Sequence, residues 1–376
     1  MLYQRTKKCF AFFRKESVLC LSVLLALLSC LFVPSGAAYF SYIDWETLAQ
    51  LFSLMAVMKG LQEANFFVSM AGLLLKRIKS TRTMLFALVF LPFVCSMVIT
   101  NDVALIVFVP FGLTILRIVL TMAQQRRLLV PLVVLQTLAA NLGSMLTPMG
   151  NPQNLYLYNR SGMGFGEFCR LLFPYFLASA VCLAAAILLI KPTHISAISV
   201  SAKTGGRRKL FFYSAGFLLC LAGVFNLLSP VVIAPVVAAA LLVFERGLLR
   251  AVDYSLLGTF FAFFIFVGNI VQIEGIRNFL ASALEGRVEL AAVLTSQVIS
   301  NVPAALLLSG FTSRWEDLII GCNFGGLGTL IASMASLISY KALIKDFPGQ
   351  KRRYLGYFTL LNIAFLILLF LLEAAL

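Results

Sequence analysis

The sequence is poor in charged side chains. Only 12% of its 376 residues are Asp, Glu, Lys or Arg, whereas soluble domains carry about 25%. With 61% hydrophobic residues and a mean hydropathy of +0.97, the chain is predicted to be a polytopic membrane protein. The 30 basic residues outnumber the 15 acidic ones, but they gather in short loops, as on cytoplasmic membrane faces. Nucleic acid is therefore not an expected partner.

Several chemistries lack the residues that they need. The single histidine, His194, cannot form a site alone. The eight cysteines are scattered without a C-x-x-C pair, which predicts small buried side chains rather than disulfides or metal ligands. No Walker loop or other nucleotide signature is present, so transport driven by the chain's own ATP hydrolysis is not expected. We expect no enzymatic activity and no cofactor, apart from Na⁺ as a coupling ion.

The stretch 141–154, Asn-Leu-Gly-Ser-Met-Leu-Thr-Pro-Met-Gly-Asn-Pro-Gln-Asn, interrupts an apolar segment of about 128–158. Lipid cannot hydrogen-bond freed backbone groups, so a broken helix at membrane depth must be surrounded by protein or by a wet cavity. Such breaks mark the substrate sites of transporters. The alternative is a packed kink, since Pro and Gly are common in membrane helices, but one proline would suffice for that.

Two further apolar runs have polar centres. Residues 84–120 are interrupted by Thr100-Asn101-Asp102 and flanked by basic residues at both ends, and residues 288–313 are interrupted at 297–303. Arms of about 15 residues are too short to cross a bilayer individually. Each run is therefore predicted to be a re-entrant hairpin.

The expected fold is all-α, with about nine spanning helices, two re-entrant hairpins and two inverted repeats. Residues 1–45 form a basic N-terminus and first spanning helix, 46–190 the first repeat, 191–209 a cytoplasmic linker and 210–376 the second repeat. The placement of basic loops predicts a plasma-membrane protein with its N-terminus in the cytoplasm and its C-terminus outside.

The repeats are visible in the motifs. Residues 54–67 parallel 264–279, Thr100-Asn101-Asp102-Val103 parallels Ser300-Asn301-Val302-Pro303, and residues 141–151 parallel 326–336. The first copy is predicted to begin outside and the second inside. Inverted repeats with paired broken helices are typical of a secondary transporter whose site lies near the midplane.

At these residues the sequence resembles the ion-transporter superfamily, which includes arsenite permeases, a class of sodium–proton antiporters, citrate carriers and sodium–dicarboxylate symporters. The resemblance covers about residues 45–345 and is strongest at 99–103, 147–154 and 296–303. The dicarboxylate branch carries Ser-Asn-Thr at each tip; this sequence keeps Asn101 and Asn301 but has Asp102 and Val302 in third place. The resemblance implies a scaffold and a transport domain that moves like an elevator, often in a homodimer.

The candidate substrate- and ion-binding residues lie at the tips and breaks: Thr100, Asn101, Asp102, Asn141, Gly143, Ser144, Thr147, Pro148, Gly150, Asn151, Asn154, Ser300, Asn301, Val302, Pro303, Gly328, Thr329 and Ser333. The second arm of each hairpin begins at a tip, where free N–H groups and the helix dipole favour an anion. Asn101 or Asp102, and Asn301, are expected to cap these arms. Carbonyls of the unwound stretches and the Asn side chains at both tips are expected to bind Na⁺.

Two charged features leave alternatives open. Asp102 is an acid at membrane depth, and it would serve as a proton carrier, a cation ligand or a cap. Lys59 and Glu63 have the i, i+4 spacing of a helical ion pair, and Lys59 alone would instead supply fixed positive charge for an anion.

These features predict a secondary active transporter of a small anion, citrate- or dicarboxylate-like or an inorganic oxyanion, coupled to Na⁺ or H⁺ across the lipid bilayer. A sodium–proton antiporter using Asp102 is the rival within the superfamily. A channel or a non-transporting membrane scaffold is the rival from another class.

Overall fold

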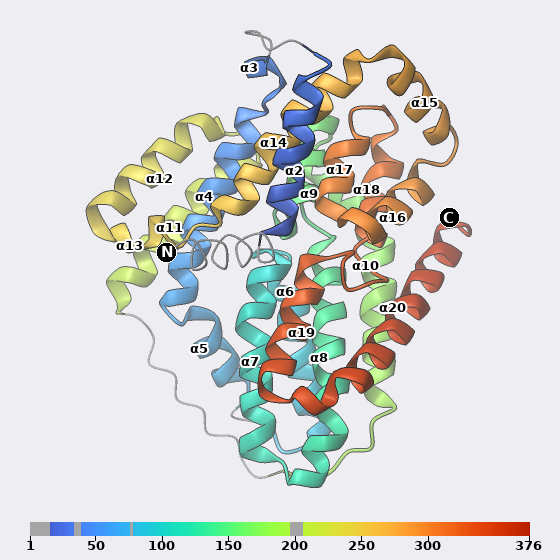
Figure 1. The fold of residues 1–376 in the computed structure, drawn as a ribbon. Coiled ribbons are helices and arrows are strands. Elements are labelled where there is room, and N and C mark those ends of the chain that lie inside the picture. The colour runs from blue at the N-terminus through green and yellow to red at the C-terminus, as the bar shows by residue number, and fades with distance from the viewer. Residues whose placement is uncertain (1–15, 34–38, 76–77, 196–205) are drawn as a thin grey trace, which may run out of the picture.

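The computed structural model describes residues 16–33, 39–75, 78–195 and 206–376, and these are folded into helices joined by short loops (Figure 1). In this part of the chain the one β-type contact is an isolated bridge between Ser80 and His194. The all-α prediction is confirmed. Among the described residues, five segments are long and apolar enough to cross a membrane: Asn101–Val119, Met122–Ser144, Phe165–Leu188, Tyr254–Gln272 and Pro348–Glu373. The count of about nine spans stays a prediction.

One set of helices, here called the frame group, packs around two central helices. Helix α2 (Ser17–Cys30) lies along α14 (Tyr254–Gln272), while α11 (Arg207–Val224) and α12 (Pro230–Phe244) lie along α4 (Trp45–Glu63). The short helix α3 (Tyr39–Tyr42) contacts α14, and the short helix α13 (Arg246–Leu249) contacts α4.

The second set, here called the hairpin group, contains both predicted hairpins and both broken helices. It consists of α6 (Thr81–Cys95), α7 (Asn101–Val119), α8 (Met122–Ser144), the 3-10 turn η1 (Pro148–Gly150), α9 (Pro152–Ser161), α10 (Phe165–Leu188), α16 (Val288–Ile299), α17 (Asn301–Leu308), α18 (Trp315–Phe324), α19 (Met334–Asp346), the 3-10 turn η2 (Pro348–Gln350) and α20 (Lys351–Glu373). Helices α5 (Phe66–Leu75) and α15 (Glu274–Leu284) connect the frame group to the two hairpins.

The order of elements repeats along the chain. A frame helix, a connecting helix, a hairpin, a broken helix and a long helix occur as α4 to α10 and again as α14 to α20. The contacts repeat as well. Hairpin α6–α7 packs against α8 of its own copy and α19 of the other, and hairpin α16–α17 packs against α18 of its own copy and α9 of the other. Each hairpin therefore touches both broken helices.

Most predicted helices appear with shifted ends, and two differences are larger. The second arm of the first hairpin, α7, has 19 residues rather than about 15, and by length and composition it could itself cross a membrane. Helix α15 was not predicted, although it occupies the same place in the second copy as α5 in the first. Its 11 residues mix polar and apolar side chains, so the sequence shows no continuous apolar run there. Most of the predicted linker 191–209 lies outside the described residues.

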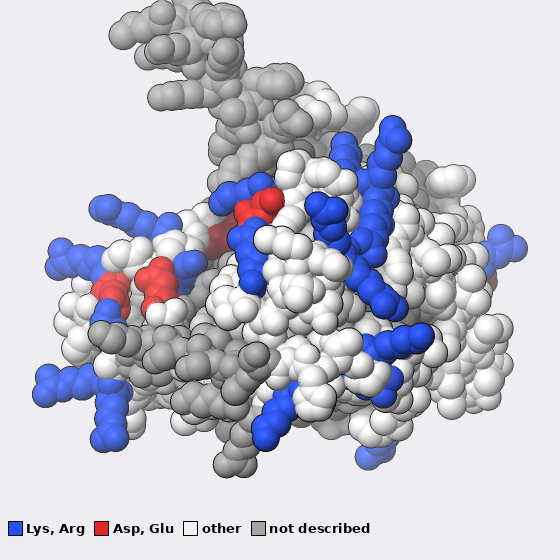
Figure 2. All heavy atoms as spheres, turned by 90° about the horizontal axis from the view of Figure 1, so that it is seen from below, with Lys and Arg blue, Asp and Glu red and all other residues white. Residues whose placement is uncertain are grey.

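Two basic parts of the chain, around the turn from α7 to α8 and the turn from α19 to α20, meet at one end of the hairpin group. Arg353, at the start of α20, donates hydrogen bonds to the carbonyls of Arg126 and Arg127 in α8. Arg117 at the end of α7 pairs with Asp346 at the end of α19, 2.8 Å apart. Figure 2 shows this end of the molecule with many basic and few acidic side chains. The shared location agrees with the positive-inside pattern, whereas the orientation in the cell stays a prediction.

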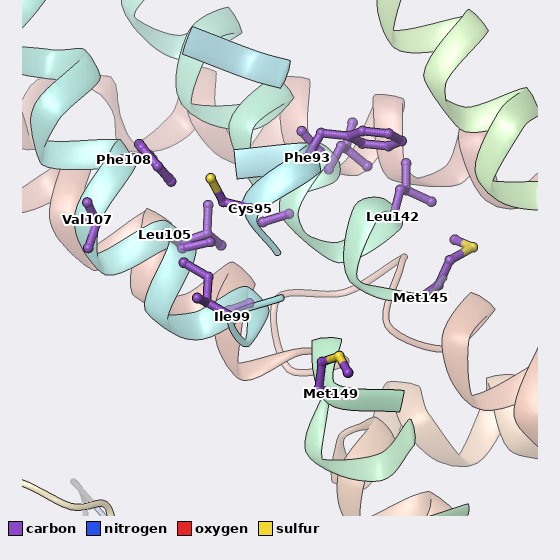
Figure 3. Close-up of a cluster of buried hydrophobic side chains, with 14 of the residues drawn as sticks. Phe93, Cys95, Ile99, Leu105, Val107, Phe108, Leu142, Met145 and Met149 are labelled. Atoms are coloured by element: carbon purple, nitrogen blue, oxygen red, sulfur yellow. The ribbon is translucent and has the colours of Figure 1, made fainter. Parts of the chain in front are cut away.

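Helix α8 is the centre of the hairpin group. Among the most apolar 18 residues of α8, 94% are buried, whereas the corresponding share is 22% in the segment that ends at Glu373. Its contact with α6 is close at Gly143, where a Cβ atom would lie 2.0 Å from the carbonyl oxygen of Phe93. Buried apolar side chains surround this contact, among them Ile99 and Leu105 from the hairpin, Leu142 from α8 and Met145 directly after α8 (Figure 3).

Replacing Gly143 by Ala should therefore destabilise the protein. A backbone carbonyl cannot move aside as a flexible side chain can, and overpacking a filled site costs about 1–3 kcal/mol. The measurement is the apparent melting temperature of the purified protein in detergent. Gly166→Ala is the matched control, because no atom lies within 4 Å of a Cβ built there. Equal melting temperatures for the two variants would contradict the close α6–α8 contact.

Candidate functional site

The side chain of Asn141 joins three elements in the interior. Its Oδ1 accepts hydrogen bonds from Asn101 Nδ2 at 2.9 Å and from Ser333 Oγ at 3.2 Å. Its Nδ2 donates to Ser336 Oγ at 3.4 Å. All four residues are buried. Because Asn101 begins α7 and Ser333 precedes α19, Asn141 holds the tip of the first hairpin and the start of α19 against the end of α8.

The second tip lies beside this cluster. The backbone N–H of Asn301 donates to the carbonyl of Ala332 at 3.0 Å, and Ser300 Oγ donates to the same oxygen at 3.3 Å. Ala332 directly precedes Ser333, which bonds Asn141. The N-terminal ends of α7, α17 and α19 therefore converge, and we call their meeting point, with Asn141, the node. None of the residues in these bonds is basic.

The break between α8 and α9 satisfies its own polar groups. Asn154 Nδ2 lies 3.3–3.5 Å from the carbonyl oxygens of Ser144, Met145 and Thr147. Asn151 Nδ2 donates to Ser144 Oγ at 2.6 Å. The Thr147 hydroxyl donates to the carbonyl of Met97, just before the first tip. Pro148 and Gly150 form the 3-10 turn within the break.

The break between α18 and α19 is closed by Gln297 of the second hairpin. Its Nε2 donates to the carbonyls of Leu327 at 2.9 Å and Gly325 at 3.2 Å, and its Oε1 accepts from Thr329 N at 2.8 Å. Gly328 has φ +104°, a conformation in which a side chain would be strained. In each copy, carbonyls of the unwound stretch thus converge on one amide nitrogen.

Three residues of this network are missing from the predicted site: Gln297, Asn323 and Ser336. Asn323 Nδ2 donates to Asn154 Oδ1 at 2.9 Å and so joins α18 to α9. All three are polar side chains within apolar runs next to a predicted tip or break. That signal was present in the sequence, but it does not say which partner each side chain has.

The hairpin arms begin one residue earlier than the capping prediction requires. The N-cap residues are Thr100 and Ser300, and neither side chain makes a capping bond. Asn101 Oδ1 does accept from the backbone N–H of Asp102 at 2.9 Å. Ser300 has φ +76°, and a non-glycine residue in that region costs of order 1–3 kcal/mol unless its surroundings hold it there.

The remaining predicted residues take no part in the hydrogen bonds of the node. Val302 and Pro303, with Ser300, line a mostly apolar cavity of about 380 Å³ between α14, α16, α17, α19 and α2. Asp102 is half-buried, and its carboxylate makes no hydrogen bond or ion pair with the described residues. Lys59 Nζ donates to Gln62 Oε1 at 3.2 Å, and no ion pair with Glu63 occurs in the described chain. Neither Lys59 nor Glu63 contributes a bond to the node.

Asn141→Ala should lower stability by about 1–3 kcal/mol, because it leaves the buried amide of Asn101 and the hydroxyl of Ser333 without their partner. The apparent melting temperature in detergent measures this loss. Asn362→Ala is the control: Asn362 is also buried, but the one side-chain hydrogen bond that it makes in the described chain, to Phe358 O, lies within α20. If both variants lose the same stability, the bonds between elements at Asn141 contribute nothing beyond side-chain volume.

Comparison with known proteins identifies the family. A family model described as citrate transporter matches residues 10–312. An uncharacterized transporter of Methanocaldococcus jannaschii is 33% identical over 302 residues, which cover 80% of this chain and 82% of that one. The inner membrane protein YbiR of Escherichia coli is 30% identical over 319 residues, 82% of this chain and 83% of its own.

A shorter match reaches a plant protein. The silicon efflux transporter LSI3 of Oryza sativa subsp. japonica is 32% identical over 147 residues, 39% of this chain and 29% of that one. These matches confirm the resemblance to the ion-transporter superfamily found at the tips and breaks. With the family match extending over most of its length, the chain belongs to the citrate transporter family and is a multi-pass membrane transporter.

Proposed function

We propose that the chain is a secondary active transporter that binds a small anion at the node and carries it across the membrane by an elevator movement, coupled to Na⁺ or H⁺. The observation that carries the proposal is the convergence of the N-terminal ends of α7, α17 and α19 around Asn141 and Ala332. Each helix start presents backbone N–H groups and the positive end of its dipole.

Three such ends favour an anion without any basic side chain. Each is worth typically 0.3–1 kcal/mol to a nearby negative charge at an exposed site, and up to about 2 kcal/mol when partly buried. The tips supply side-chain amides and hydroxyls from Asn101, Asn301 and Ser300, and the start of α19 supplies the hydroxyl of Ser333. Such groups would fix the orientation of a ligand. Donors of this kind suit the oxygens of a carboxylate or an oxyanion.

Na⁺ is proposed as a coupling ion at the Asn101 and Asn301 tips. Hard cations prefer carbonyl, amide and hydroxyl oxygens. The unwound stretches already gather such oxygens, three around Asn154 Nδ2 and two from residues 325–327 around Gln297 Nε2. The bonds to Asn154 are long for N–H···O contacts, so this amide is a weak competitor for its carbonyls.

The proposed substrate classes are taken from the descriptions of the family and of one relative. The matching family is described as citrate transporter, and one relative is named a silicon efflux transporter. Both a citrate-like carboxylate and an inorganic oxyanion present several oxygens around a compact centre, which the converging helix ends can bind.

The division into frame and hairpin groups supports the elevator movement. Direct contacts between the groups are few compared with those inside each group, and they involve mainly α14 with α17 and α4 with α9. Asn159 at the end of α9 donates to Thr47 Oγ1 at 3.0 Å and Gln50 Oε1 at 3.1 Å of α4. The two connecting helices, α5 and α15, would act as the arms between the groups.

The first test is thermal stabilisation of the purified protein by citrate, succinate, phosphate and arsenate, each with and without Na⁺, at two pH values. A ligand that binds only the folded state stabilises it by about 2.7 kcal/mol at one hundred times its Kd. We expect one class of anion to raise the melting temperature, with a dependence on Na⁺ or pH. Ser333→Ala should weaken that effect. If no anion raises the melting temperature under any condition, the anion-carrier proposal fails.

The elevator movement is tested by a cross-link between the groups. In a background without native cysteines, Thr47→Cys with Asn159→Cys places thiols on side chains that now touch, and their cross-linking should abolish transport. Thr81→Cys with Thr193→Cys is the control, because those hydroxyls are 3.2 Å apart within the hairpin group and its adjoining loop. Undiminished transport by the fully cross-linked first pair would rule out the movement.

One observation favours a sodium–proton antiporter as the second candidate. The half-buried carboxylate of Asp102 has no hydrogen-bond or ion-pair partner in the described chain. In that case Na⁺ alone should stabilise the protein, and Asp102→Asn should remove both this effect and any pH dependence of transport. A channel is separated from both candidates by accumulation of solute against its gradient.

A further inference from the structure

A second cavity, of about 390 Å³, lies where the frame and hairpin groups meet, away from the basic end of the molecule. Its frame-group side consists of the segment 41–44 and of α14 from Phe264 to Gln272. Its hairpin-group side consists of α9, through Tyr156 and Arg160, and of α17, through Leu306 and Ser309. The volume falls within the range of small-molecule sites. No predicted binding residue lines it.

Arg160 supplies the positive charge of this cavity. It lines the cavity together with Tyr156 and forms no ion pair within the described residues. The other charged group, Asp44, is already engaged: its two carboxylate oxygens accept from Thr47 N at 2.9 Å and from Thr47 Oγ1 at 2.8 Å. Asp44 also faces the N-terminal end of α4, whose dipole favours a carboxylate.

The floor of the cavity separates it from the node. Tyr156 and Ser309 share a buried hydrogen bond of 2.8 Å between their hydroxyls. The Tyr156 ring packs against Phe260 and Phe264 of α14, with centroids 6.2 and 5.6 Å away. One turn deeper on α9, Gln153 is fully buried and neither its Oε1 nor its Nε2 has a hydrogen-bond partner. Because i and i+3 share a helix face, Gln153 lies below the floor.

We propose that this cavity is an anion-capture vestibule of the transport pathway, in which Arg160 binds the anion before the Tyr156–Ser309 contact opens towards the node. The inference rests on the proposed function, since it assigns the entrance for the anion that the node would carry. The guanidinium suits planar or tetrahedral oxyanions because it offers several donors in a fixed fork. Below the floor, the Gln153 amide offers a donor and an acceptor to the anion and its hydroxyl groups.

The vestibule can be tested without transport, because a natural reporter stands beside it. The chain has two tryptophans, and Trp45 follows Asp44 directly and packs edge-on against Phe261 of α14, with centroids 6.5 Å apart. In the full chain with Trp315→Phe, Trp45 is the sole tryptophan. Its fluorescence quenching by iodide, an anion, is compared with quenching by neutral acrylamide.

We expect Arg160→Gln to lower iodide quenching by about twofold, because the attraction between one unit charge and an anion in water is of the order of RT, and to leave acrylamide quenching unchanged. Arg160→Lys should restore iodide quenching. Arg170→Gln is the matched control, since it removes an exposed charge from α10 outside the cavity. Unchanged iodide quenching in Arg160→Gln, or an equal loss in Arg170→Gln, overturns the vestibule.

A transport arm separates this inference from the function on which it rests. With citrate or phosphate as the labelled solute, Arg160→Gln should raise KM about tenfold for the anion presented on the vestibule side and leave KM for the anion presented on the other side unchanged. Because a substitution cannot change the transport equilibrium, kcat for exit through the vestibule should fall by the same factor. An equal rise of KM on both sides, or a matching loss of melting temperature, indicates a structural role and overturns the proposal. If the quenching result holds but no anion is transported, anion binding by Arg160 in this cavity stands, whereas the proposed function and the cavity's place in a transport pathway fail.

Discussion

The structure depends on one constraint: a helix that is broken inside a membrane must find partners for its freed backbone groups within the protein. The two breaks meet this constraint in the same way, by turning several carbonyls towards one side-chain amide, Asn154 in the first and Gln297 in the second. A buried group left unpaired would cost about 1–3 kcal/mol. The amides therefore decide where the chain can unwind, and the tips of the hairpins come to lie where the unwound stretches end.

Few hydrogen-bonding groups at the node are free for a ligand. Asn141 uses its Oδ1 for two hydrogen bonds and its Nδ2 for one, and a primary amide offers at most two acceptor positions and two donors. A solute that enters must exchange some of these bonds for its own, so the net gain is smaller than the number of contacts suggests. Binding that rearranges bonds between α7, α8 and α19 also changes the packing of the hairpin group. In the proposed transporter, substrate occupancy would thereby be linked to the conformation of the whole group.

The sequence predicts where this structure is polar but not which polar groups meet. Lipid tolerates so few hydrophilic residues that Thr100–Asp102, 141–154 and 297–303 stand out, and all three prove to be tips or breaks. The bond between Asn141 and Ser336 spans 195 residues, and only the packing of α8 against α19 creates it. The sequence also does not decide between neighbouring partners of one side chain: Lys59 bonds Gln62, three residues further on, rather than Glu63. Helix α15 was not predicted because its 11 residues mix polar and apolar side chains and so leave no apolar run.

The contact between α14 and α17 relates the two cavities to each other. Phe263 lines the cavity next to the second tip and Phe264 lines the cavity with Arg160, while α17 contributes Val302 to the first and Leu306 to the second. The same pair of helices, α14 of the frame group and α17 of the hairpin group, therefore lines both cavities. Sliding α17 along α14 would shorten one cavity and lengthen the other, because close-packed helices are nearly incompressible. Alternating access requires this reciprocity, and a pore that opened both cavities together would have to part α14 from α17 and expose Phe260, Phe264 and Tyr156 to water.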